Sequence, residues 1–450
     1  MDIPIEQRLA SWVEAETGVA VSRLALIPGG ASRRSYRVER GNAAPVFLRV
    51  DSGGGPLSGT GFTLAREWSF LKPLSDRGYP VPRVLAYSAE LNAILMEHVE
   101  GTTSYHVRVS DETQRLIEHA LIDCVVELQR IPPAELGIAD YAGRETVGAA
   151  IRAALDTWQP LYAETVSFKD PAVDFALEWL RHHVPDADAP SVLVHGDVGP
   201  GNFLFRADGS IAAMIDWELA RIGHPLEDLA CILCRALGVD FGTPERLVAD
   251  FAAISGRPVA RRSLDYAVVL VIAEWCVGIH RALSRPNAQL DLTMLYVYGH
   301  SNRHAMLEKL GELAGRSLPP EPALPADPFE LDFLGRHVEE SLTDVLLPAT
   351  TDAFASHRVN RLLQLQKIQS ALLAYGRARY EQEDMERAGE LLGRRFASHA
   401  EAMQALIARA PAAAREGDTA FLDLLLWRVA RERALLREGM GDMAMRRISY

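Results

Sequence analysis

One polar stretch near the middle of the chain constrains it more than any other feature. His195-Gly196-Asp197 is followed by Asn202 and then by Ile215-Asp216-Trp217-Glu218. Between these groups, Asp208-Gly209 separates two apolar runs, which predicts a β-hairpin that brings Asn202 and Asp216 to the same end. A two-residue turn pairs Asn202 with Ile215 instead of Asp216, so a bulge or a strand end must correct the alternation of side chains.

These residue types favour the transfer of a phosphoryl group from ATP to a hydroxyl. Such a reaction has a loose transition state, so the protein must supply positioning, a base and ligands for magnesium. Asp197 is the predicted base, and Asn202 and Asp216 are the predicted Mg²⁺ ligands, because this ion prefers oxygen ligands and takes one or two carboxylates. His195 is expected to fix the catalytic loop by hydrogen bonding. The alternative is that Asp197, Asn202 and Asp216 are ordinary turn and cap residues.

Val194–Phe205, taken with Ile215–Glu218 and Pro225–Ala230, resembles the aminoglycoside phosphotransferase and choline kinase family of small-molecule kinases. The Trp-Glu pair after Asp216 is similar to a branch often encoded alongside acyl-CoA dehydrogenases. The resemblance covers about residues 5 to 310. It implies an α+β fold with the two lobes of a protein kinase, a small β-rich N-lobe and a helical C-lobe. It also implies that Asp228 holds the catalytic loop through its backbone.

The same resemblance implies an ATP site in the N-lobe. Ile27–Val38 predicts a strand, a glycine-containing turn and a second strand, so Gly29, Gly30 and Ser32 are expected to cover the ATP phosphates. The strand that follows carries Arg49, in the position where the kinase pattern has its phosphate-binding cation. Remoter family members and protein kinases have lysine there. Arginine can fill the role because it stays charged and grips phosphate oxygens with two donors.

Two further segments complete the expected nucleotide site. Residues 62–77 have helical spacing, and Glu67 on this helix is the expected ion-pair partner of the phosphate-binding arginine. The alternative is that Glu67 is a solvated helix charge. Ala93–Gly101 resembles the strand and hinge where backbone groups meet adenine, so the segment from Glu97 to Val99 is the predicted adenine contact.

Composition and charge narrow the classes of partner. The chain has 450 residues, a formal net charge of −13 and a pI near 5.5, which argues against a nucleic-acid partner because such a partner favours a basic face. The first residues lack the basic start and apolar core of a signal peptide. The longest apolar predicted helix, Tyr266–Leu283, contains Glu274 and His280 and falls short of a membrane span. We therefore expect a cytoplasmic protein with no membrane partner.

Cys231 and Cys234 lie in an apolar helical run, which favours a buried helix face over a metal or redox site.

Proline marks the expected domain boundary. Residues 316–328 are proline-dense, so they predict a semi-rigid linker. This linker separates the N-lobe at residues 1–100 and the C-lobe at residues 101–315 from a helical accessory domain at residues 329–450. The accessory domain resembles an uncharacterised helical domain found beside such kinases, and it is the expected surface for any homo-oligomer.

Helical periodicity is found at residues 111–130, 147–162, 172–183, 226–237, 244–255, 263–283 and 294–311, and then at 330–347, 356–381, 385–408 and 419–438 in a predicted antiparallel bundle.

Two classes of function fit these patterns. The first is an active ATP- and Mg²⁺-dependent kinase of a small-molecule hydroxyl substrate, with a hydroxyacyl-CoA as the expected acceptor and an aminoglycoside as its rival. The second is a pseudokinase-like module that binds nucleotide and serves the helical domain. The intact Asp197, Asn202 and Asp216 favour the first, whereas Arg49 in place of lysine favours the second.

Overall fold

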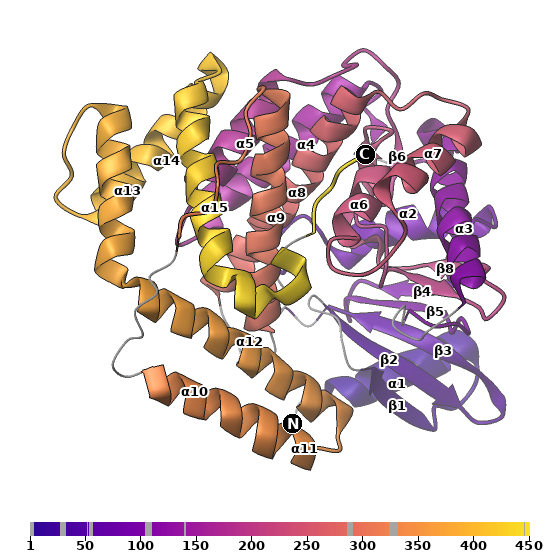
Figure 1. Ribbon diagram of the computed structural model, residues 1–450. Helices are drawn as coiled ribbons and strands as arrows, with labels where there is room; N and C mark the ends of the chain where they lie inside the picture. Colours follow the sequence, from indigo (N-terminus) through magenta and orange to yellow (C-terminus); the bar gives the residue numbers. More distant parts are fainter. Residues whose placement is uncertain are drawn as a thin grey trace. The chain divides into compact units, whose positions relative to one another are not determined.

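The computed structural model describes residues 4–27, 33–51, 53, 57–103, 110–138, 141–285, 291–323, 332–444 and 446–450 (Figure 1). The chain divides into two units. The first comprises Met1–Ala153, Asp186–Ala267 and Ser449–Tyr450, and the second comprises Ala154–Pro185 and Val268–Ile448. Each unit is described by itself below.

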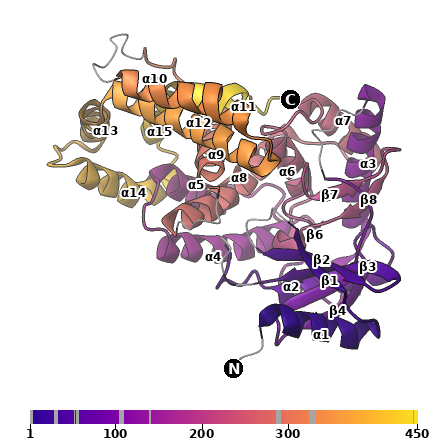
Figure 2. The same ribbon diagram turned by 90° about the horizontal axis from the view of Figure 1, so that it is seen from below.

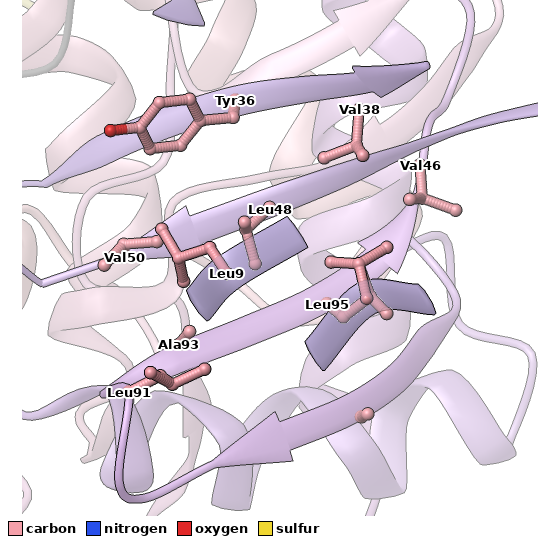
Figure 3. Close-up of a cluster of buried hydrophobic side chains, with 11 residues drawn as sticks. Leu9, Tyr36, Val38, Val46, Leu48, Val50, Leu91, Ala93 and Leu95 are labelled. Carbon is pink, nitrogen blue, oxygen red and sulfur yellow. The ribbon is translucent and has the colours of Figure 1, made fainter. Parts of the chain in front are cut away.

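The first unit opens with an antiparallel sheet in the order β1-β2-β3-β5-β4. Its side chains alternate between two faces, as the strand period requires. On β3, Val46, Leu48 and Val50 are buried with Leu9 of α1 in the cluster that Figure 3 shows. Arg49 therefore points to the opposite face. The bounds are α1 (Ile5–Thr17), β1 (Arg23–Ile27), β2 (Arg34–Arg40), β3 (Ala43–Val50), β4 (Val84–Ser88) and β5 (Ala93–Glu97).

Helix α2 (Leu64–Asp76) lies between β3 and β4 in the sequence. Thr63 caps its start by accepting a hydrogen bond from the Arg66 backbone N–H. The helix buries Glu67 together with apolar residues, and only 1% of the Glu67 side chain is exposed. The alternative interpretation of Glu67 as a solvated charge is therefore wrong.

The rest of the first unit holds the predicted hairpin. Strands β7 (Phe203–Phe205) and β8 (Ile211–Met214) pair antiparallel, with Phe203 opposite Met214 and a register shift after Leu204. The turn closes through the Arg206 N–H to Ser210 O hydrogen bond, and Gly209 takes the left-handed conformation at φ +84°. The other elements are β6 (Val192–Val194), which pairs with β9 (Arg221–Gly223), the short 3-10 helices Pro133–Leu136 and Trp217–Leu219, and the helices α3 (Asp111–Arg130), α6 (Glu227–Arg235) and α7 (Pro244–Ser255).

Helices α4 (Val147–Thr165) and α8 (Arg261–Ser284) each include residues of both units. The structure differs from the expectation for α8. The helix has 24 residues, and an 18-residue stretch of it has a mean hydropathy of 1.6, so its length and composition would suffice to span a membrane despite Glu274 and His280. However, 72% of that stretch is buried, as in the core helix of a folded domain.

The second unit is helical throughout its described residues. Helix α14 packs on α5, α15 packs on α9 and α12, and α10 runs along α12 in both views (Figures 1 and 2). Phe175 of α5 stacks on Phe421 of α15 with ring centroids 5.8 Å apart. The bounds are α5 (Pro171–His182), α9 (Leu292–Leu313), α10 (Asp332–Glu340), a π-helical turn (Ser341–Leu346), α11 (Leu347–Ala349), α12 (Ala353–Tyr375), α13 (Arg377–Leu392), α14 (His399–Glu416), α15 (Thr419–Met440) and a 3-10 turn (Gly441–Ala444).

This division differs from the expected boundary at residues 316–328, because helices before that stretch share a unit with the C-terminal helices. Periodicity shows that a helix has an apolar face but not which helix covers it. Two predicted helix spans are also wrong. The predicted helix 356–381 is broken at Gly376, and the predicted helix 385–408 ends at Gly393, which takes φ +67°, before Ser398 caps α14.

Candidate active site

A cavity of about 570 Å³ lies in the first unit. Its polar walls come from strand β3, helix α2, the segment after β5, the loop before β7 and the residues after β8. This collects most of the predicted nucleotide and metal residues, which are Arg49, Glu67, Glu97, Val99, Asn202 and Asp216. Apolar side chains of Phe47, Leu71, Met96 and Leu204 also line it. Gly29, Gly30 and Ser32 lie outside the described residues.

The loop that begins at His195 is held by backbone hydrogen bonds. Asp228, on α6, accepts from the backbone N–H groups of His195 at 2.9 Å and of Gly196 at 3.0 Å, as the resemblance implied. Position 196 admits only glycine. Its φ is +82°, and a Cβ built there would lie 2.4 Å from the carbonyl oxygen of Leu219.

The His195 side chain is fully buried and anchors the loop through hydrogen bonds of both its ring nitrogens. Its Nδ1 accepts from the Asp197 backbone N–H at 3.3 Å, so Nε2 carries the proton and donates to the Ile215 carbonyl at 2.9 Å. Burial lowers the pKa of His195 to about 4. The imidazole is therefore neutral near pH 7, with both nitrogens engaged, which agrees with an anchoring role.

Asp197 is held by two side chains. Asn202 Nδ2 donates to Asp197 Oδ2 at 2.8 Å and to the Asp197 carbonyl at 2.8 Å. Arg235, at the end of α6, donates from Nε to Oδ1 at 3.1 Å and from Nη2 to Oδ2 at 2.5 Å. Burial raises the pKa of Asp197, and the Arg235 guanidinium opposes that shift. The carboxylate is thus fixed in one orientation.

Sequence reasoning missed Arg235, and the loop after His195 shows only that a residue without a side chain is needed beside it. Gly199 has φ +144°, and a Cβ there would lie 2.6 Å from Arg235 Cδ. Arg235 Nη1 also donates to the Pro200 carbonyl at 3.0 Å. The glycine in this loop therefore makes room for the arginine, but no pattern in the sequence says which cation fills that room.

Asp216 shows how the hairpin corrects its register. The Ile215 N–H donates to the Asn202 carbonyl at 3.0 Å, so Asn202 does lie opposite Ile215. Asp216 then takes the left-handed conformation, at φ 67° and ψ 60°, which is uncommon for a residue other than glycine. The strand end, rather than the bulge, brings Asp216 to the cavity. Local strain of this kind is concentrated at functional sites.

Two arginines beside the cavity, Arg33 and Arg49, share the carboxylates of Glu67, Asp216 and Glu218. Arg49 forms an ion pair through Nη2 with Asp216 Oδ1, and its Nε lies 3.5 Å from Glu67 Oε1. The main partner of Glu67 is Arg33, which also donates to the Phe62 carbonyl at 2.7 Å. Arg49 and Glu67 do lie together, but the closer pairings are Arg33 with Glu67 and Arg49 with Asp216. Position in the sequence could not show this exchange.

The charges in this cluster shift one another. Burial would raise the pKa of Asp216, but the Arg49 guanidinium brings it below its ordinary value. Burial and the neighbouring Asp216 raise the pKa of Glu218 to about 7. Asp216 is therefore an anion at neutral pH, while Glu218 keeps its proton to higher pH than an ordinary glutamate.

The residues fit a magnesium ion. The Nδ2 group of Asn202 makes both hydrogen bonds to Asp197, which leaves the amide oxygen as its acceptor for a cation. Asp216 supplies a carboxylate at the same cavity. Across the described residues no group of three or more His, Cys, Asp and Glu is placed to hold a metal. One carboxylate and one amide match the way Mg²⁺ binds together with substrate phosphates.

The segment after β5 forms the other wall. Glu97 donates its backbone N–H to the Arg83 carbonyl at 2.9 Å, and Thr102 exchanges two backbone hydrogen bonds of 3.1 Å with Phe205. At Gly101 a Cβ would lie 3.1 Å from Leu204 Cβ, so glycine allows the close approach to β7. The predicted hinge therefore runs along the cavity edge between β5 and the hairpin.

Comparison with known proteins places these features in a family. Residues 23–266 match the model of the phosphotransferase enzyme family. Two curated relatives are acyl-CoA dehydrogenase family member 11 of Gallus gallus, 28% identical over 209 residues, and of Rattus norvegicus, 30% identical over 210 residues. Each match covers 45% of this chain and 26% of the relative, so the chain spans about a quarter of the relatives' length.

A solved structure shows the same fold. A candidate aminoglycoside phosphotransferase from Ralstonia eutropha is 19% identical with a TM-score of 0.50, and the match covers 66% of this chain and 94% of that chain. The expected α+β, protein-kinase-like class is confirmed.

Proposed function

Because the chain belongs to the phosphotransferase enzyme family, we propose that it transfers the γ-phosphoryl group of ATP to a hydroxyl group of a small molecule in a Mg²⁺-dependent reaction. The observation that carries this proposal is the carboxylate of Asp197, oriented by Asn202 and Arg235. Asn202 and Asp216 line the cavity, and Asn202 contacts Asp197 beside it. Base and metal ligands are thus linked through one side chain, that of Asn202.

The hydrogen bonds of Asp197 support one of its two oxygens as the proposed base. Oδ2 accepts from both Arg235 and Asn202, so its two lone pairs are used, whereas Oδ1 accepts only from Arg235 Nε. Oδ1 would take the proton of the acceptor hydroxyl as the new O–P bond forms. The bond between the γ-phosphorus and the bridging oxygen breaks, and ADP leaves with that electron pair.

The cluster on the other side would hold the phosphates. Arg49, 12% exposed at its side chain, would turn from Asp216 to a phosphate oxygen, while Glu67 keeps its ion pair with Arg33. Asp216 and the Asn202 amide oxygen would hold Mg²⁺. The bound ion would neutralise charge on the phosphate oxygens.

The acceptor that we favour is a hydroxyacyl-CoA. Support comes from the relatives in chicken and rat, whose name assigns them to the acyl-CoA dehydrogenases and which match 45% of this chain. The test is Mg²⁺-dependent consumption of ATP by the full chain with a panel of short hydroxyacyl-CoAs, aminoglycosides and amino alcohols, with Asp197→Asn as the control. An aminoglycoside turned over faster than every hydroxyacyl-CoA would contradict this choice. We further propose that the reaction takes place in the cytoplasm.

One observation favours the second candidate, a nucleotide-binding module without turnover. The residue expected to bind phosphate and the residue expected to bind metal pair with each other, Arg49 with Asp216. If that ion pair persists with nucleotide bound, ATP would bind with the same affinity with and without Mg²⁺, and no acceptor would be phosphorylated. Titration of ATP at both conditions distinguishes the two candidates.

A further inference from the structure

The second unit contains its own cavity of about 530 Å³. It is bounded by α9, the segment 316–321, α15 and the stretch before the C-terminus. This volume lies in the range of pockets that bind drug-sized or cofactor-sized ligands. The active-site residues all belong to the first unit, so this cavity is a separate site.

Arginines reach this cavity from three segments of the chain. They are Arg316 after α9, Arg433 and Arg437 one turn apart on α15, and Arg447 near the C-terminus. Arginine presents a planar fork of donors that suits phosphate and carboxylate oxygens. The four guanidinium groups therefore approach the cavity from several directions, which arginines on a single helix could not do.

The carboxylates at the cavity do not balance these cations. Glu321 is shared by two arginines, with Oε1 lying 2.8 Å from Arg433 Nε and Oε2 paired with Arg437. Glu308 pairs with Arg447 at 3.0 Å. Glu312 is engaged by Lys309 at 2.8 Å, and Arg316 by Asp423 outside the cavity. Three guanidinium groups therefore face two carboxylates.

Arg433 is the buried member of this group. Its side chain is 9% exposed, and its Nε lies near Glu321 without the geometry of a hydrogen bond. Its Nη1 contacts Nε2 of His304 at 2.9 Å, and because a guanidinium only donates, the imidazole must be neutral and accept. Burial, together with Arg433 and Arg447, lowers the pKa of His304 to about 3. The wall of the cavity is thus positive and incompletely paired.

We propose that this cavity binds a phosphate-bearing small molecule of about nucleotide size, held by Arg433, Arg437 and Arg447. Donors that converge from separate segments suit a tetrahedral group with several acceptor oxygens better than a planar carboxylate. The ligand would displace Glu321 from one of its two arginines and would join α15 to the C-terminal stretch. Since it would bind the folded state only, it would raise the melting temperature of the second unit.

The test uses pyrophosphate as the probe, titrated by calorimetry into the full chain without Mg²⁺. We expect the double variant Arg437→Gln with Arg447→Gln to raise the dissociation constant for pyrophosphate at least tenfold. Both side chains are about half exposed, at 47% and 51%, so the variant should fold. Glu321→Gln should tighten binding several-fold, because it removes the carboxylate that competes for the arginines.

The matched control separates this cavity from the active site. Arg49→Ala removes a cation from the first unit and should leave the tight pyrophosphate site unchanged. The proposal is overturned if Arg49→Ala abolishes pyrophosphate binding, or if the arginine pair and Glu321→Gln both leave it unaltered. In the latter case the arginines serve only as ion-pair partners. This test does not depend on any phosphotransfer activity, so its outcome is distinct from that of the proposed function.

Discussion

Arg235 holds both carboxylate oxygens of Asp197, with Nε 3.1 Å from Oδ1 and Nη2 2.5 Å from Oδ2. The two residues lie on different elements, the loop after β6 and the end of α6. A base paired with a cation is oriented but also weakened, since the positive charge favours the ionised carboxylate. The pairing therefore lowers the basicity of Asp197, but it fixes the direction of the carboxylate and makes the group ionise more readily.

Arg235→Ala should move the acid limb of the pH–rate profile to higher pH. Burial raises the pKa of Asp197 and Arg235 lowers it, so without the arginine the carboxylate stays protonated to higher pH. At neutral pH the loss in kcat should be roughly tenfold to a hundredfold, as for one charge-assisted hydrogen bond. Arg235→Lys, which keeps the charge, should leave the limb near its wild-type position. An unshifted limb in Arg235→Ala would show that another cation sets this pKa.

Asp197→Asn and Asp216→Ala should separate chemistry from binding. Asp197→Asn should reduce transfer by about 10²–10⁴-fold or more and leave the MgATP affinity within a few-fold, because a base acts on the acceptor. Asp216→Ala should instead weaken the Mg²⁺-dependent part of nucleotide binding. Calorimetry with ATP, with and without Mg²⁺, measures both effects. The opposite pattern in the two variants would show that the roles are exchanged.

Much of this site could be predicted from the sequence because its signals are local. The hairpin around Asp208-Gly209 and the buried apolar runs on each side are encoded within a few residues, and α3 and α7 begin and end where periodicity placed them. The pairing of Arg235 with Asp197 could not be predicted, because the two residues lie on different elements. A basic residue at the end of a helix is also common, so Arg235 does not stand out in the sequence. The pairing of Arg33 with Glu67 depends in the same way on side-chain distances after folding.

Arg33→Ala should destabilise the first unit even though no catalytic role is assigned to it. Arg33 and Glu67 are 3% and 1% exposed, so removing one partner leaves a buried carboxylate with only Arg49 at 3.5 Å. Breaking a buried ion pair costs about 3–5 kcal/mol. The double variant Arg33→Met with Glu67→Leu should cost less than the sum of the single changes. Urea unfolding measures each free energy, and additive losses would show that the two side chains are independent.

Glu218 should make stability depend on pH. Its pKa is raised to about 7 in the folded protein from 4.5, so the folded state holds the proton that the unfolded state releases. The contribution is fully present below about pH 4.5 and is lost as pH rises through 7. The unfolding free energy should therefore change less between pH 5 and 8 in Glu218→Gln than in the wild type, by on the order of 2 kcal/mol. A wild-type slope that Glu218→Gln retains would assign the titration to another buried carboxyl, since burial raises the pKa of Asp174 to about 7 and that of Asp228 to about 6.

Buried ion pairs in the second unit determine what a cut in the proline-rich stretch, residues 316–328, should do. Arg303 on α9 pairs with Asp170 and with Glu432 on α15, and all three side chains are about nine-tenths buried. A cut after Pro320 would place Arg303 and Glu432 on different fragments. Glu432 would then lose its arginine and Arg303 would keep only Asp170, and α14 and α15 would lose their packing on α5 and α9.

We therefore expect the isolated fragment 321–450 to be helical by circular dichroism but to melt without cooperativity. The matched control is the same pair of fragments produced together, which should associate and melt in one transition because the buried pairs are restored. Stacking of Phe175 on Phe421 should contribute to that association. A cooperative melt of the isolated fragment would instead support an independent accessory domain that begins after residue 328.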